Sequence, residues 1–137
     1  MGCDFIRLVF LSVVVYTNYM GMTEVELTIS NPRNGKQSVT DIFLVDGGAA
    51  YTVVPASIVE KLKLEPQFTR EFILADGKRV KRSIGGAVIR FKGEEIPVPV
   101  VLGKKGDSAL LGAITLEAFG LALDPFQRKL YKAKMML

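Results

Sequence analysis

Apolar and polar residues alternate in the segment "EVELTIS", where Val25, Leu27 and Ile29 share one side of an extended chain. A period of two is typical of a half-buried β-strand. The following "NPRNGK" predicts a turn, with Asn34-Gly35 able to take positive φ. The segment "SVTDIFLV" predicts a second strand that becomes wholly apolar over Ile42 to Val45. Because that run has no polar face, it predicts a strand covered on both sides.

Two further hairpins are predicted in the middle of the chain. The segment "REFILADGKRV" places apolar residues on either side of a turn at Asp76-Gly77. The segment "GAVIRFKGEEIPVPVVLG" predicts a second hairpin that turns at Lys92-Gly93-Glu94. Pro97 and Pro99 interrupt its returning strand, which predicts an unpaired edge there, because proline has no N–H to donate.

Two short helices complete the pattern. The segment "ASIVEKLKL" follows Pro55 and places Ile58 and Leu62 on one helical face. The segment "ALLGAITLEAFG" predicts a strand that breaks at Gly112 and continues as a helix ending at Gly120. Many short strands and two short helices indicate an all-β fold, with a closed or barrel-like sheet.

Residues 1–19 differ from the rest of the chain, and we treat them as an extension of a domain that spans residues 20–137. Leu8 to Tyr16 is almost continuously apolar, but a helix that spans a bilayer needs about 20 apolar residues. An upstream start codon, with Met20 or Met22 beginning the domain, is one interpretation; a buried or interface strand, a leader and a membrane anchor are the others. We expect a cytoplasmic protein, or a membrane-associated or exported one if this extension acts as an anchor or a leader.

Composition excludes several kinds of chemistry. The chain has 137 residues, no histidine and one cysteine, Cys3. It therefore cannot form a Ser-His-Asp or Cys-His site, an HExxH zinc site or an internal disulfide. Its net charge of +4 is too small to indicate nucleic-acid binding. We expect no cofactor and no metal, so any chemistry has to come from carboxylates, hydroxyls, lysines or the backbone.

Several polar residues have both a structural and a functional interpretation. The segment "FLVDGGAAYTVVP" ends an apolar strand in Asp46, and Asp-Gly-Gly taken alone is a turn sequence. Tyr51 fits ordinary core packing as well as a place at a dimer interface or a substrate cleft. A turn role is also predicted for three other aspartates, and Asp41 is expected to be exposed. Those three aspartates are Asp76, Asp107 and Asp124.

A basic run follows the Asp76-Gly77 turn. It consists of Lys78, Arg79, Lys81 and Arg82. Such a run could attract an acidic substrate or a nucleic acid. No aromatic residues alternate with it as they do in single-strand binders, so a solvated hairpin arm is favoured.

The order of two motifs resembles the retropepsin-like (clan AA) aspartic proteases, a family of single-domain enzymes, and most closely their small microbial type. The segment "FLVDGGAAYTVVPASIVEKL" is similar to the family's active-site strand and loop, and "ALLGAITLEAFGLALDP" to its second signature. The resemblance covers Thr23 to about Tyr131. It implies a homodimer with one active site, in which both subunits supply Asp46 and an extended peptide or protein is the substrate.

The resemblance also implies a role for each matching residue. Asp46 would be catalytic, and the two Asp46 carboxyl groups of the dimer would hold one proton between them and activate a water molecule. Leu110, Leu111 and Gly112 would support the active site. The active-site loop and the flap that closes over the substrate would be formed by Gly47, Gly48 and Ala49 and by Ala75, Asp76, Gly77 and Lys78.

Gly47 departs from the family pattern, which has threonine or serine at this position. In the family that hydroxyl makes a hydrogen bond across the dimer, and glycine cannot make it. The first hypothesis is therefore an aspartic endopeptidase of low activity. The alternatives are an inactive dimer of the same fold that binds peptides or serves in assembly, and a monomeric β-barrel adaptor.

Overall fold

The computed structural model describes residues 5–10, 13–18, 23–124, 126–127 and 129–137, the first two segments by their backbone alone. Met20 and Met22, the two candidate start residues, lie outside these ranges, as does Cys3. The elements in chain order are β1 (Phe5–Phe10), β2 (Val13–Asn18), β3 (Thr23–Asn31), β4 (Asn34–Val45), β5 (Thr52–Val54), α1 (Ala56–Leu62), β6 (Pro66–Ile73), β7 (Arg79–Phe91), β8 (Glu94–Leu102), β9 (Leu110–Leu111), α2 (Ala113–Ala118), β10 (Leu121–Asp124) and β11 (Lys129–Lys132).

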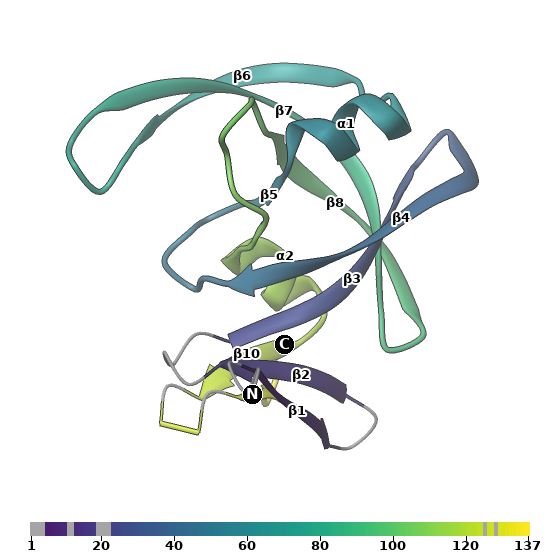
Figure 1. The fold of residues 1–137 in the computed structure, drawn as a ribbon, viewed down its shortest axis with the longest axis vertical. Helices are drawn as coiled ribbons and strands as arrows, with labels where there is room; N and C mark the ends of the chain where they lie inside the picture. The colour runs from purple at the N-terminus through teal and green to yellow at the C-terminus, as the bar shows by residue number, and fades with distance from the viewer. Residues whose placement is uncertain (1–4, 11–12, 19–22, 125, 128) are drawn as a thin grey trace.

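Strand pairing closes the central part of the sheet into a ring. Between residues 23 and 124, β3 pairs with β4, then β9, β5, β8 and β7 follow in order, and β7 returns to pair with β3. Figure 1 shows these strands wrapped around a common interior, with α2 against one end. The strands of the ring point alternate side chains inward, so Val25, Leu27 and Ile29 are buried as the period of two predicted. The all-β prediction with two short helices is confirmed.

Two terminal hairpins lie outside the ring, as does β6, which pairs with β7. β1 pairs with β2, and β2 pairs with the first residues of β3, so this hairpin extends the edge of the sheet. β10 and β11 form a separate two-stranded sheet. The interpretations of residues 1–19 stay predictions. Neither helix in the described part of the chain has the length and apolar content needed to cross a bilayer.

Two details of the predicted β3–β4 hairpin were wrong. Its turn lies at Pro32-Arg33, inside the predicted segment 31–36, but Asn34 and Gly35 do not take positive φ and already belong to β4. The Asn31 side chain explains the shift, because its Oδ1 accepts the Arg33 N–H at 2.8 Å and closes the turn early. β4 is also not covered on both sides: Phe43 is fully buried, whereas Ile42 is 41% exposed.

The other predicted elements are confirmed. α1 follows Pro55 and buries Ile58 and Leu62, and Gly120 ends the α2 segment with a φ of +67°. β8 is continuous through both prolines, so the predicted interruption was wrong. The predicted unpaired edge is present, because β8 pairs with β5 only from Val100 onward.

Candidate active site

Asp46 stands directly after β4, where that strand runs parallel to the short β9. Its backbone N–H donates to the Leu111 carbonyl at 2.9 Å, and the Leu44 N–H donates to the Ala109 carbonyl at 3.0 Å. These bonds fix the backbone on both sides of Val45, which is buried. The Asp46 side chain is half-buried. The ring of strands therefore holds one carboxylate at its surface, on a backbone that is fixed by hydrogen bonds.

The loop after β4 folds back on the Asp46 carboxylate. The Gly48 N–H donates to Asp46 Oδ1 at 3.0 Å, and the Ala49 N–H donates to the Asp46 carbonyl at 3.1 Å. A Cβ on Gly48 would lie 3.3 Å from the same Oδ1, whereas a Cβ on Gly47 would meet no atom within 4 Å. Both glycines are exposed, but they differ in their surroundings: Gly48 is close to the carboxylate, whereas Gly47 has space around it.

The segment after β9 supports this loop from behind. The N–H groups of Ala113 and Ile114 donate to the carbonyls of Ala49 and Ala50 at 2.8 and 2.9 Å. Gly112 lies so close to Tyr51 that a Cβ there would overlap the Tyr51 carbonyl group. Leu111 therefore bonds Asp46 itself and Gly112 lies against the loop, whereas Leu110 pairs with Leu44 and Val53 of the flanking strands. Their role as supports of an active site stays a prediction.

A buried pair of hydroxyl groups joins the same elements. The Thr52 hydroxyl donates to Thr115 Oγ1 at 2.7 Å, and Thr52 Oγ1 accepts the Gly112 N–H at 3.1 Å. Both threonine side chains are fully buried. The pair therefore links β5, the turn before α2 and α2 itself through polar atoms that have no access to water. The sequence gave no signal for this contact, because the two threonines are 63 residues apart.

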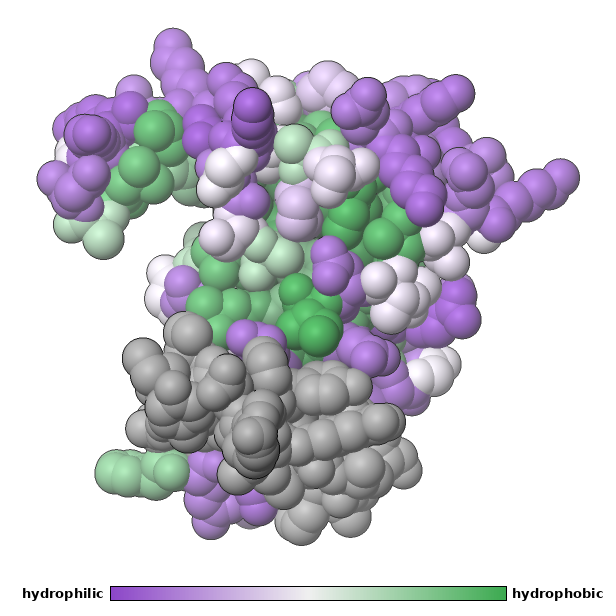
Figure 2. Space-filling model, in the orientation of Figure 1, coloured by the Kyte–Doolittle hydropathy of each residue, from purple (hydrophilic) through white to green (hydrophobic). Residues whose placement is uncertain are grey.

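The hairpin of β6 and β7 projects from the ring on the side where β4 ends (Figure 1). We call residues 66–85 the arm. In Figure 2 the arm overhangs a hollow in the surface, with apolar residues along part of it and hydrophilic residues at its outer edge. At the tip, Gly77 has a φ of +86° and Asp76 Oδ1 accepts the Lys78 N–H at 2.9 Å, so the predicted turn is confirmed. The hydrogen bonds of the tip stay within the tip.

Comparison with known proteins identifies the architecture. One similar solved structure is a retropepsin-like aspartic protease from Rickettsia conorii, with a TM-score of 0.59 and 22% sequence identity over 80% of this chain and 82% of that chain. Another is the EIAV protease in complex with the inhibitor HBY-793, with a TM-score of 0.56 and 19% identity over 88% and 97% of the two chains. The fold is that of the retropepsin-like aspartic proteases. No protein-family model and no curated protein matches the sequence.

Within this retropepsin-like fold, Tyr51 connects the segment after the Asp46 loop to the arm. Its hydroxyl oxygen accepts a hydrogen bond from Arg70 Nε at 3.1 Å. Its ring meets the Phe72 ring edge-on, with centroids 5.9 Å apart. The Tyr51 side chain is therefore held by contacts with β6 and lies between that strand and the Asp46 loop, not in the core.

A partly buried ion pair ties the arm to the loop before β9. Arg82 Nε lies 2.7 Å from Asp107 Oδ2, and Arg82 Nη2 lies 3.0 Å from Asp107 Oδ1. The Arg82 hydrogen bonds hold the pKa of Asp107 below its usual value, although burial opposes the shift. Asp107 also accepts the Lys104 N–H at 2.8 Å, so its predicted turn role is only part of its function in the fold.

The basic run on the arm is largely neutralised. Arg79 Nη1 lies 3.0 Å from Glu71 Oε1, and Lys78 Nζ lies 3.9 Å from Asp76 Oδ2. Arg82 forms its ion pair with Asp107. The prediction of a solvated arm was wrong for Arg82, whose side chain is only 18% exposed. Lys81 is exposed and has no ion pair in the described part of the chain.

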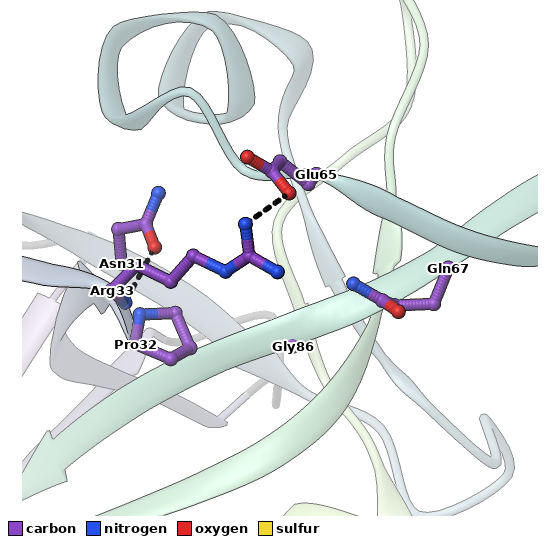
Figure 3. Close-up of a pocket in the computed structure, with 6 residues that line it drawn as sticks. All are labelled: Asn31, Pro32, Arg33, Glu65, Gln67 and Gly86. Atoms are coloured by element: carbon purple, nitrogen blue, oxygen red, sulfur yellow. Dashed lines mark hydrogen bonds and ion pairs between the residues drawn. The ribbon is translucent and has the colours of Figure 1, made fainter.

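A shallow pocket of about 210 Å³ lies at the other end of the β3–β4 hairpin from Asp46 (Figure 3). Pro32, Gln67 and Gly86 line it together with the Arg33–Glu65 ion pair of 3.1 Å. It is smaller than the pockets that hold drug-sized ligands, which measure roughly 300–1,000 Å³. The Asn31 side chain at its rim donates to the Leu62 and Lys63 carbonyls and so closes the end of α1. These contacts give the region a structural role.

Proposed function

We propose that this protein is an aspartic endopeptidase that acts as a symmetric homodimer. The observation that carries the proposal is the position of Asp46: in a fold shared with aspartic proteases, it stands on the fixed turn after β4 and its carboxylate accepts the Gly48 N–H. One chain supplies one such carboxylate. A second copy related by a two-fold axis supplies the other.

The chemistry requires two carboxyl groups that share a proton. Two carboxylates within hydrogen-bonding distance repel each other, so the pair holds one proton between them. The ionised Asp46 takes a proton from a water molecule, whose oxygen attacks the carbonyl carbon of the peptide bond. The protonated Asp46 of the other subunit donates its proton to the carbonyl oxygen. The C–N bond then breaks as a proton passes to the amine nitrogen.

The arm supplies the second part of the proposed site. It overhangs the side of the molecule where β4 ends (Figures 1 and 2). Because β6 is the last strand of its sheet, its outer edge can pair with an extended peptide. Ala75, Asp76, Gly77 and Lys78 at its tip are the proposed flap. Closure of such a flap excludes water from the reacting bond and aligns it with the two carboxyl groups.

The test is cleavage of unstructured peptides at mildly acidic pH by wild type and by Asp46→Asn. General acid–base catalysis contributes roughly 10²–10⁴-fold, so Asp46→Asn is expected to lower kcat/KM by at least the lower bound. Asp41→Asn is the matched control, because Asp41 is an exposed aspartate of β4 whose side chain, among the described residues, accepts a hydrogen bond from its neighbour Ile42 alone. Equal activity of Asp46→Asn and wild type would refute the proposal.

Dimerisation needs its own measurement. Near the dissociation constant, the rate per milligram of protein is expected to rise with protein concentration. Addition of excess Asp46→Asn subunits is expected to depress wild-type activity, because a mixed dimer has a single carboxyl group that can ionise. A rate strictly proportional to concentration, in a range where sedimentation shows only monomer, would contradict the proposal.

Gly47 favours a second candidate function, an inactive dimer that binds extended peptides or serves in assembly. Gly47 is exposed and has no side chain to make a hydrogen bond across the proposed two-fold axis. In that case wild type and Asp46→Asn bind peptides equally and neither cleaves them.

A further inference from the structure

Two arginines lie side by side on the face of the arm that is turned toward the body. Arg70 of β6 and Arg82 of β7 are directly opposite each other in the antiparallel register. Directly opposite residues point to the same side of a sheet, and like charges in such a pair repel. The contacts of Arg70 with Tyr51 and of Arg82 with Asp107 identify this side as the inner face of the arm.

The two charges are neutralised unequally. Asp107 neutralises Arg82 through two hydrogen bonds. No carboxylate in the described part of the chain forms an ion pair with Arg70. Four other arginines have described side chains, and each of them has a carboxylate partner. They are Arg33, Arg79, Arg82 and Arg90.

Neutral groups hold the Arg70 guanidinium in place. Its Nε donates to the Tyr51 hydroxyl at 3.1 Å, and its Cζ lies 4.8 Å from the centre of the Phe68 ring. The Tyr51 ring is in turn held by its edge-on contact with Phe72. Only Nε is used, and the two terminal nitrogens make no hydrogen bond within the described residues. A fixed guanidinium with both terminal nitrogens available is well suited to bind a carboxylate through two parallel hydrogen bonds.

The sequence limits the distance between Asp46 and Tyr51, the residue that holds this guanidinium. Tyr51 is the fifth residue after Asp46, so the two Cα atoms are separated by at most about 18 Å. An extended peptide advances about 3.3 Å per residue. Five to six residues of an extended peptide therefore span the Asp46–Tyr51 distance at its upper limit, so the five positions on either side of the bond to be cleaved are the ones to test for a contact with Arg70.

We propose that Arg70 is a specificity-determining residue that binds an aspartate or glutamate side chain of the peptide substrate, with Tyr51 as its positioning residue. The proposal rests on the proposed function, because it assumes that an extended peptide lies between the arm and Asp46. A substrate carboxylate would supply the missing counter-ion of Arg70 and offset its repulsion by Arg82. The protein is therefore expected to select acidic peptides.

The experiment uses pairs of peptides that differ by glutamate or glutamine at one position, for each of the five positions on either side of the cleaved bond. Wild type is expected to cleave the glutamate peptide of one pair with a kcat/KM roughly tenfold higher, since hydrogen bonds to charged groups have about that effect. The difference is expected in KM. In Arg70→Gln, the ratio of kcat/KM between the glutamate and the glutamine peptide is expected to fall to about twofold or less.

Lys81→Gln is the matched control, because it removes one positive charge from the same hairpin on the outer face, next to Arg82 in sequence. It is expected to keep the glutamate preference. Tyr51→Phe removes the hydroxyl that accepts from Arg70 but keeps the ring against Phe72. It is expected to weaken the glutamate preference through KM and by less than Arg70→Gln does, as a positioning role requires.

Binding of the same peptides to Asp46→Asn, measured by fluorescence anisotropy, separates the two proposals. If wild type cleaves peptides without a glutamate preference, or if Arg70→Gln retains that preference, the role of Arg70 is refuted and the protease function stands. If no peptide is cleaved but Asp46→Asn binds the glutamate peptide more tightly in an Arg70-dependent way, the protease function fails and the Arg70 site stands.

Discussion

Arg82 and Asp107 form an ion pair between the arm and the loop before β9, with Nε–Oδ2 and Nη2–Oδ1 distances of 2.7 and 3.0 Å. The two side chains are 18% and 23% exposed, which distinguishes this pair from the other ion pairs of the arm. Both prongs of the guanidinium are used, so the pair fixes orientation as well as distance. It joins β7 of the arm to the loop before β9, next to the residues where β7 begins to pair with β8.

Asp107→Asn is expected to destabilise the protein by about 1–3 kcal/mol at neutral pH, because hydrogen bonds between charged groups are lost in a partly buried place. The effect depends on pH. The pKa of Asp107 is lower in the folded protein than in the unfolded chain, where it is about 3.9. The stabilisation is therefore complete above that unfolded value and is lost as the pH falls through the lower folded value.

Urea denaturation of wild type and Asp107→Asn between pH 2 and pH 7 measures this effect, with the two curves expected to converge at the acid end. Glu65→Gln is the control, since the Arg33–Glu65 pair is largely exposed, and such pairs contribute only about 0–1 kcal/mol. A stability difference for Asp107→Asn that does not change with pH would contradict the interpretation.

Local sequence patterns predicted the strands, helices and turns. They could not predict contacts between residues that are far apart in the sequence. The turn at Asp76-Gly77 and the turn at Lys92-Gly93 were predicted from their glycines, and Gly77 and Gly93 take positive φ. Lys92 also takes positive φ, for which its residue type gave no signal. The β3–β4 turn lies near the start of its predicted segment, because the Asn31 side chain closes it before the Asn-Gly pair three residues later. Nothing local predicts the pairing of β3 with β7 that closes the ring.

Only the parts of the candidate site that belong to sequence motifs could be predicted. Asp46, Gly48 and Leu110 to Gly112 belong to segments recognised by their order along the chain. The contacts of Tyr51 with Arg70 and of Arg82 with Asp107 join residues 19 and 25 positions apart and carry no periodic signal. The sequence of a hairpin does not reveal whether one of its charged residues contacts water or a buried carboxylate.

Gly112→Ala is expected to destabilise the protein by about 2–3 kcal/mol, because the new Cβ would overlap the Tyr51 carbonyl group. Backbone strain is not the reason, since the Gly112 φ of −96° is open to alanine. Gly35→Ala is the control: its Cβ would meet no atom within 4 Å, so a change within about 0.5 kcal/mol is expected. Thermal and urea unfolding measure both. Equal effects would show that Gly112 is not closely packed.

Thr52→Val is expected to cost more stability than Thr115→Val. Thr52 Oγ1 both donates to Thr115 and accepts the Gly112 N–H, so its loss leaves two buried polar groups without a partner. We expect about 1–3 kcal/mol for Thr52→Val and the lower end of that range for Thr115→Val. In urea denaturation the double variant should cost less than the sum of the two single variants. Strict additivity would contradict a direct hydroxyl–hydroxyl bond.

Gly47→Thr is expected to tighten the proposed dimer and raise peptidase activity. Space is available, because a Cβ at this position meets no atom within 4 Å and the backbone φ is not positive. Each added hydrogen bond across the two-fold axis contributes about 0.5–1.5 kcal/mol. With one bond from each subunit, the dimer dissociation constant should fall roughly tenfold.

Sedimentation equilibrium and cleavage at mildly acidic pH measure the two effects of Gly47→Thr, and Gly47→Ala is the control, since it fills the same space without a hydroxyl. Gly47→Ala should leave the dissociation constant nearly unchanged. A tighter dimer that neither cleaves peptides nor binds a statine-type inhibitor, whose hydroxyl occupies the place of the attacking water, would favour the inactive peptide-binding dimer. Tighter association with higher kcat would identify Gly47 as the residue that limits the activity of this aspartic site.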